Sequence, residues 1–460
     1  MRSPGPSAEL SRTLEDAPYP SSVQGWSAVF VLSLLYLLSM MDRNLMALLA
    51  DAVGRDLRLG DVELGLLYGA AFAVLYSVAG LPLGWAIDRY PRRFVIWLGV
   101  VGWSLATTYC GLSRNFFELF ASRAGVGIGE AALVPGSQSI IADLFPPSRL
   151  ALPMSVYGLG NKVGGGLSFI IGGALTVLFP AAASFHILGL GEMKGWQMVF
   201  IVAGLPGLLI SFIMFAIPEP ERRRRSSGEE TAKTTFGDYG RFIKKNFRFS
   251  FGYHTGSITT MMVSTSISTW TPTYFARVHG WGTDRIGSLL GIAMLVGPLI
   301  GIPLHGHFAD RLFRAGRSDA HLHYFKVVLL MAIAPAMLVY VVPNPWMALA
   351  LVALSQGLFA AYLGLLSTSL QLMVPGDLRG KAASVALLIV GIGGMSLGPP
   401  LIGFLTDYVF GDRQKIGLSM AVSIGLLLPL TIAILSLAQK PMREHLSVVA
   451  SRPDAGASHG

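Results

Sequence analysis

Twelve apolar runs recur along this chain, and each is long enough to cross a bilayer as an α-helix, which takes roughly 20 residues. Only 13% of the 460 residues are charged, against about 25% in soluble domains. Water solvates such an apolar surface poorly, so lipid is the expected solvent. We predict an all-α membrane protein with spans at 26–50, 62–87, 94–112, 115–142, 151–178, 196–217, 248–275, 284–310, 325–342, 346–373, 381–408 and 415–438.

The basic residues predict the orientation of the chain. With both termini in the cytoplasm, about 24 Lys and Arg fall in cytoplasmic segments and about 8 outside, which is the sense of the positive-inside rule. We therefore interpret the formal charge of +9 as a topology signal and not as evidence of a nucleic-acid-binding surface. The first ~25 residues lack the apolar core of a signal peptide. We expect a multi-pass protein of the plasma membrane or bacterial inner membrane that keeps its first helix.

The two halves of the chain repeat each other. The segment GLPLGWAIDRYPRR (80–93) follows the second span, and GIPLHGHFADRLFRAGR (301–317) follows the eighth. An offset of six spans is typical of transporters built from two six-helix bundles. We predict a tail (1–25), a first bundle (26–217), a cytoplasmic linker (218–247), a second bundle (248–438) and a tail (439–460). The linker carries Arg222 to Arg225 and a possible amphipathic piece near 236–245; the four arginines suit either a topology anchor or anionic lipid.

The first of these loops resembles the signature of the major facilitator superfamily. Gly84, Asp88, Arg89, Arg92 and Arg93 match the pattern Gly-x-x-x-Asp-Arg-x-x-Arg-Arg at every named position. A degenerate copy covers 306–314. The resemblance spans the whole chain apart from its tails, and it implies twelve helices in two pseudo-symmetric six-helix bundles that work by alternating access.

A finer resemblance is to the spinster branch, whose members move lysophospholipids and sphingosine phosphate. It rests on Met41-Asp42-Arg43-Asn44 in the first span, on 122–131 (SRAGVGIGEA) in the fourth, and on 142–146 (ADLFP) with the following Arg149. Transporters of acidic sugars and aromatic acids are the nearest alternatives within the superfamily.

Charged residues inside the spans are the candidate transport site. A charge at such depth is costly unless it faces a partner or a watery cavity. Spacing puts Asp42 and Arg123 at similar depth, with Glu130 two turns deeper. A carboxylate beside an arginine stays ionised, and separating the two lets it take a proton. We predict Asp42 and Glu130 as proton-coupling groups, with Arg43 and Arg123 as charge partners or substrate ligands; static ion pairs are the alternative. Lys162, in the middle of the fifth span, suits an anionic head group or a structural ion pair equally well.

A second set of residues is predicted to gate the pathway. Asp88 can face the positive N-terminus of a helix in the other half, and Arg92 can pair with Asp143. We expect such contacts to form only when the cytoplasmic side is closed. The predicted gating residues are Gly84, Asp88, Arg89, Arg92, Arg93, Asp143, Arg149, Asp310 and Arg311. Simple positive-inside anchoring is the alternative.

Helix surfaces suggest where the two halves meet. The seventh span is rich in Ser and Thr between residues 257 and 269, a stripe that we expect to face the cavity. Glycines crowd the fifth and eleventh spans, which lets helices approach closely and either slide or lock.

We therefore expect a proton-coupled transporter, acting as a monomer in lipid, for amphipathic substrates of lysolipid or sphingolipid-phosphate type. Small organic anions, such as sugar acids or aromatic acids, are the alternative. The only coupling ion expected is the proton, with no cofactor or metal. A lipid-processing enzyme would need a nucleophile or metal constellation, which the sequence lacks, and intact gating motifs argue against a receptor or channel.

Overall fold

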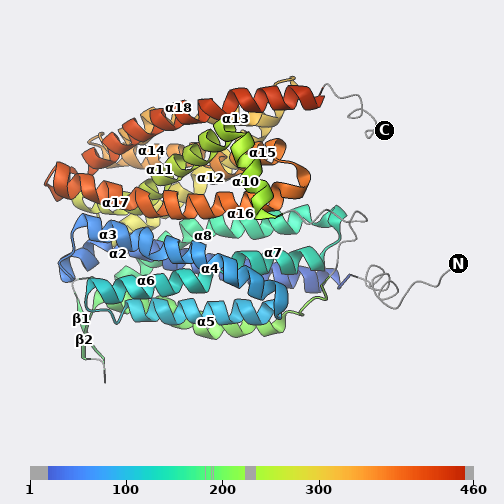
Figure 1. Ribbon diagram of the computed structural model, residues 1–460. Coiled ribbons are helices and arrows are strands. Elements are labelled where there is room, and N and C mark those ends of the chain that lie inside the picture. The colour runs from blue at the N-terminus through green and yellow to red at the C-terminus, as the bar shows by residue number, and fades with distance from the viewer. Residues whose placement is uncertain (1–18, 182, 188, 190, 223–234, 451–460) are drawn as a thin grey trace.

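The computed structural model describes residues 19–181, 183–187, 189, 191–222 and 235–450. These residues form twelve helical rods packed side by side (Figure 1). The predicted all-helical architecture is confirmed. Each predicted apolar run coincides with a rod, with ends that differ by a few residues, or by more where the rods continue beyond the apolar stretch.

The rods of the first half, called the N half below, precede the linker. They are α2 (Ser22–Asp56), α3 (Asp61–Tyr68) continued by α4 (Ala70–Arg89), α5 (Arg92–Cys110), α6 (Phe116–Glu130) continued by α7 (Leu133–Leu144), α8 (Ala151–Leu178), and α9 (Gly195–Ser211) with the turn Phe212–Ala216.

The rods of the second half, called the C half, follow a short helix, α10 (Phe236–Lys245). They are α11 (Phe247–His279), α12 (Thr283–Arg314), α13 (Ala320–Leu338), α14 (Pro345–Phe359) continued by α15 (Ala361–Met373), α16 (Arg379–Val390) joined by a π-helical turn (Gly391–Met395) to α17 (Ser396–Phe404) and Leu405–Val409, and α18 (Ile416–Ala450).

Nine rods of the described chain are long and apolar enough to cross a membrane by length and composition alone. The other three are α5, the pair α6 and α7, and α11. Their shortfall has a local cause: α5 opens with Arg92 and Arg93, α6 carries Arg123 and Glu130, and α11 is rich in Ser and Thr. The rods that depart from the apolar pattern are thus among those that carry polar groups into the interior.

The halves lie one against the other, with α5 and α18 at opposite edges (Figure 1). We call the end at which α2 begins and α18 ends, with α10 near it, the terminal end. The opposite end is the hairpin end, because strands β1 (Ser184–Ile187) and β2 (Gly191–Lys194) project from it. They pair antiparallel, with Phe185 opposite Met193. The sequence pattern gave no hint of this hairpin, since two four-residue strands carry little periodic signal.

Small residues let the two halves touch. A Cβ atom on Gly291 of α12 would lie 2.6 Å from the carbonyl oxygen of Gly166 on α8, and one on Gly65 of α3 would lie 2.7 Å from the carbonyl oxygen of Pro399 on α17. Any larger side chain at these points would push the halves apart. The glycine-rich fifth and eleventh spans therefore both lie at the seam between the halves.

Candidate functional site: a charged cluster, a polar cavity and an apolar pocket

A buried ion pair joins α2 to α6 in the N half. The Nη2 atom of Arg43 lies 2.6 Å from Oε2 of Glu130, and Nε of Arg43 donates to the same oxygen at 2.7 Å. Ser39 Oγ donates to it as well, at 2.7 Å. The Glu130 side chain is fully buried, whereas 21% of the Arg43 side chain is exposed. Arg43 is thus the member of the pair that reaches open space.

The rest of this cluster surrounds Asp42. Arg123 is buried and donates from Nη1 to the backbone oxygen of Asp42 at 3.0 Å. Among the described residues, no cationic nitrogen lies within 4.0 Å of the Asp42 carboxylate. The ring of Phe72 lies near both guanidinium groups, with its centroid 4.5 Å from Arg43 Cζ and 5.7 Å from Arg123 Cζ.

This geometry decides a pairing that the sequence left open. Arg43 was predicted as a charge partner without a choice between Asp42 and Glu130, and it pairs with Glu130 from another helix, not with its neighbour Asp42. Adjacent residues of an α-helix point about 100° apart, so sequence adjacency does not bring their charged ends together. Glu130 and Arg123 are both buried, and neither lines the cavity between the halves.

A polar cavity of about 190 Å³ lies between the halves, and Lys162 of α8 reaches it. Asn44 lines it from the N half, and Ser264, Ser268 and Gln356 line it from the C half. Within the described part of the chain, Lys162 forms no ion pair within 4.0 Å. The Ser- and Thr-rich stripe of α11 thus reaches the cavity, and the lysine in its wall has no carboxylate to neutralise it.

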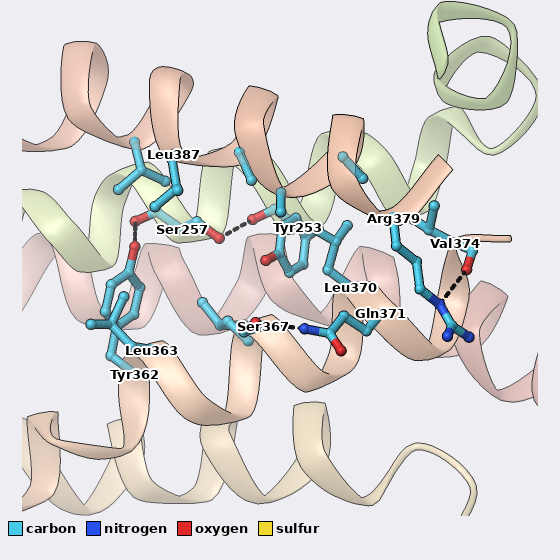
Figure 2. A pocket seen from close by; sticks show the side chains of 15 residues that line it. Tyr253, Ser257, Tyr362, Leu363, Ser367, Leu370, Gln371, Val374, Arg379 and Leu387 are labelled. Carbon is cyan, nitrogen blue, oxygen red and sulfur yellow. Dashed lines mark hydrogen bonds between the residues drawn. The ribbon is translucent and has the colours of Figure 1, made fainter. Parts of the chain in front are cut away.

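A second hollow, of about 260 Å³, lies inside the C half between α11, α15 and α16 (Figure 2). Its walls are mainly leucine, valine and alanine, and Arg379 stands at one end. Sequence analysis missed this pocket, because a leucine that lines a hollow and a leucine that faces lipid look alike in a sequence.

The halves are joined at the hairpin end. Arg277 of α11 donates from Nη1 and Nη2 to the two carboxylate oxygens of Asp61, at 2.6 and 2.8 Å, and from Nε to Asp51 at 2.9 Å. Asp407 accepts from the backbone nitrogen of Val62 at 2.9 Å. Arg413 donates to the backbone oxygen of Leu59, and Thr283 to Thr176.

At the terminal end the halves do not meet in this way. The hydrogen bonds named above, which join the halves, all lie at the hairpin end. Toward the terminal end, a Cβ atom on Gly84, Gly158, Gly306 or Gly380 would meet nothing within 4 Å. The structure therefore represents a state closed at the hairpin end.

The predicted gating residues lie at the terminal end, mostly on exposed surface. Asp88, Arg89, Arg149, Asp310 and Arg311 are exposed. Asp88 has no hydrogen bond to any described residue, and Asp310 lies 3.7 Å from His321. Arg89 stacks on Trp85 of its own helix.

Arg92 differs from these exposed gating residues. It is buried and pairs with Asp143 and Glu219 of its own half, and the backbone nitrogens of Arg92 and Arg93 donate to Glu219. The pair with Asp143 is therefore present while the terminal end is open. The prediction that it forms only on closure is wrong, because both partners belong to the N half and can meet without contact between the halves.

The first part of the linker also forms hydrogen bonds to the N half. Arg222 donates from Nη2 to the backbone oxygens of Ile87 and Tyr90, which end α4. Arg223, Arg224 and Arg225, for which lipid contact was considered, lie outside the described residues. The amphipathic piece predicted near 236–245 is α10, whose buried Tyr239 contacts His254 of α11 at 3.3 Å.

Comparison with known proteins places the whole arrangement in context. The family model described as Major Facilitator Superfamily matches residues 32–319. An "MFS-type efflux pump" of Mycolicibacterium smegmatis is 26% identical over 87% of this chain and 88% of its own. A "D-galactonate transporter" of Escherichia coli is 25% identical over 80% of this chain and 85% of its own.

A solved structure is similar over nearly the full length. It is the crystal structure of a bacterial homologue of the human lysosomal transporter Spinster, in an inward-facing and unoccupied conformation. The TM-score is 0.75 at 25% identity, covering 93% of this chain and 98% of that one. The resemblance to the spinster branch is confirmed, and so is the expectation that this chain is a transporter and not an enzyme.

Proposed function

The chain belongs to the Major Facilitator Superfamily, and we propose that it moves an amphipathic anion of lysolipid or sphingolipid-phosphate type across the membrane, coupled to protons, by alternating access. The protein would lie in the plasma membrane or bacterial inner membrane, with its terminal end facing the cytoplasm. One chain supplies both sides of the polar cavity, which supports action as a monomer.

The observation that carries the anionic part of this proposal is Lys162. Its ammonium group lies in the wall of the cavity between the halves, with no described carboxylate within 4.0 Å. An unpaired cation in a low-dielectric site attracts an anion more strongly than one in water. A phosphate or carboxylate head group beside Lys162 would also neutralise it when the site closes around the substrate.

The buried cluster supports proton coupling. The Oε2 atom of Glu130 accepts hydrogen bonds from Ser39 and Arg43, and its Oε1 atom has no hydrogen-bond partner among described residues. A buried carboxylate oxygen without a partner costs about 1–3 kcal/mol, which a proton relieves. Protonation of Glu130 would release Arg43, the one member of the pair that reaches open space. We propose Asp42 as the second proton group, since it is buried without an ion pair.

Small organic anions remain the second candidate, and one observation favours them. Asn44, Ser264, Ser268 and Gln356 give the cavity hydroxyl and amide groups that suit a hydroxyl-rich acid. The similarity to the D-galactonate transporter points the same way. The apolar pocket of the C half favours the amphipathic substrate, because a sugar acid leaves it unused.

The test is uptake or release in proteoliposomes, with and without a pH gradient. We expect a lysophospholipid to move faster than galactonate, and Lys162→Gln to reduce transport at least tenfold. Lys440→Gln, at a lysine of α18 whose side chain is 80% exposed and outside the cavity, serves as the matched control. Transport of galactonate alone would overturn the amphipathic substrate, and a pH gradient without effect would overturn the coupling.

A further inference from the structure

We propose that the apolar pocket of Figure 2 holds the hydrocarbon chain of the transported anion while its head group lies beside Lys162, and that Arg379 limits the length of that chain. This inference rests on the proposed function and narrows the substrate to single-chain amphiphiles.

The two hollows lie along one face of α11. Ser257 lines the apolar pocket, and Ser264 and Ser268 line the cavity that holds Lys162. Positions 257, 264 and 268 are seven and eleven residues apart, which places them on the same face of a helix, about 10 and 16 Å along it. A molecule with a head and a tail could therefore occupy both hollows at once.

The walls of the pocket suit a hydrocarbon. Figure 2 shows side chains of α15 and α16 facing each other across it, with Leu363 and Leu387 among them. Leu363 is 57% exposed and Leu387 is 68% exposed. The rest of the chain leaves this apolar surface uncovered in the present state, so a hydrocarbon chain can lie over it.

Three polar side chains of the pocket form hydrogen bonds with neighbouring lining residues. Tyr362 donates to the backbone oxygen of Ser257 at 3.3 Å, and Ser257 Oγ donates to the backbone oxygen of Tyr253 at 2.7 Å. Gln371 donates to Ser367 at 3.3 Å. These groups have hydrogen bonds already, so a methylene chain can lie against them without leaving them unpaired.

Arg379 marks the far end of the pocket. It begins α16, its Nε donates to the backbone oxygen of Val374 at 3.3 Å, and it is exposed. It forms no ion pair with a described carboxylate. Val390, at the other end of the lining, is eleven residues further along the helix, or about 16 Å. A chain long enough to pass Arg379 meets a hydrated charge, so its last methylenes gain nothing.

The experiment measures binding of a series of alkyl phosphates, from hexyl to octadecyl, to the full chain in zwitterionic nanodiscs, with empty nanodiscs as the partition blank. Affinity should rise about fourfold per methylene and then level off. Arg379→Leu should move the plateau to longer chains. Ala386→Phe, which fills the pocket, should move it to shorter ones.

Two control variants should leave the plateau unchanged: Arg379→Lys, which keeps the charge, and Leu330→Phe on α13, which is 63% exposed and outside the pocket. A plateau unmoved by Arg379→Leu, or affinity independent of chain length, would overturn the inference. If hexyl phosphate still binds in a Lys162-dependent way, the proposed function survives that failure. If Lys162→Gln leaves hexyl phosphate binding intact, the proposed head-group site fails as well.

Discussion

Arg277 donates hydrogen bonds to both carboxylate oxygens of Asp61, and this bidentate pair joins the C half to the N half at the hairpin end. The Arg277 side chain is 5% exposed and that of Asp61 is fully buried. A planar guanidinium matched to a carboxylate in this way is both strong and directional. Moving the halves apart at this end would break it and leave both charges without a partner.

Replacing Arg277 should therefore open the hairpin end. Arg277→Met leaves the Asp61 carboxylate buried without its cation, a loss of about 3–5 kcal/mol in the closed state, so the population should shift by at least tenfold. Distances between spin labels at Arg58 and Gln414, which are exposed on the two halves at this end, would report the change. The matched control is Arg55→Gln, which removes a 70% exposed partner of Asp51 within α2. Unchanged distances in Arg277→Met would show that the glycine contacts alone close this end.

Asp88→Ala should affect closure of the terminal end. Asp88 is exposed and has no described partner in this state, so the substitution should leave thermal stability unchanged within about 0.5 kcal/mol. It should lower the population closed at the terminal end, since a carboxylate facing a helix N-terminus contributes about 0.3–1 kcal/mol there. Label distances across the terminal ends measure this, with Glu221→Ala, another exposed acid, as control. An equal shift in both variants would mean that net charge, and not a specific contact, is responsible.

Glu130→Gln and Asp42→Asn should each blunt the response to acid. A neutral amide at position 130 mimics the protonated acid and frees Arg43 from its ion pair. Lowering the pH should shift the balance between the two open states in wild type and shift it less in each variant. Spin-label distances recorded across a pH series give the readout, and Ser39→Ala removes a neutral contact to Glu130 for comparison. A double variant with the full wild-type response would place the proton switch elsewhere.

Asp319 should make stability depend on pH. It precedes α13, outside the spans, and accepts hydrogen bonds from Arg317, Gln439 and Arg443. Burial acts to raise the pKa of Asp319, but these hydrogen bonds outweigh it and hold the pKa below its usual value. The contribution is thus complete above the unfolded pKa of about 3.9 and lost as pH falls through the lower folded pKa.

Asp319→Asn should accordingly cost about 1–3 kcal/mol at neutral pH and nothing once the carboxylate is protonated. Thermal unfolding in detergent across pH measures the difference. Glu444→Gln, whose side chain is 66% exposed, should be near neutral at every pH. A penalty for Asp319→Asn that persists at low pH would point to packing and not to charge.

The sequence by itself determined the membrane class, the twelve rods and the superfamily. Apolar runs of this length have one stable form in lipid, because each backbone group must be paired within its own segment. The repeated loop around Gly84 to Arg93 then identified the architecture. Burial of Asp42 and Glu130 followed from their positions deep inside helices, and the polar stripe on α11 followed from its Ser and Thr content.

Only the tertiary structure decided which charges meet. Arg43 pairs with Glu130 across 87 residues and Arg277 with Asp61 across 216, and nothing local to either residue signals its partner. The same holds for Arg92, whose partner Glu219 lies just after the end of the sixth rod. Hydrophobic periodicity fixes what a helix buries, but ion pairs form between atoms a few ångströms apart, and that proximity is set by how the helices pack and by which end of the two halves is closed.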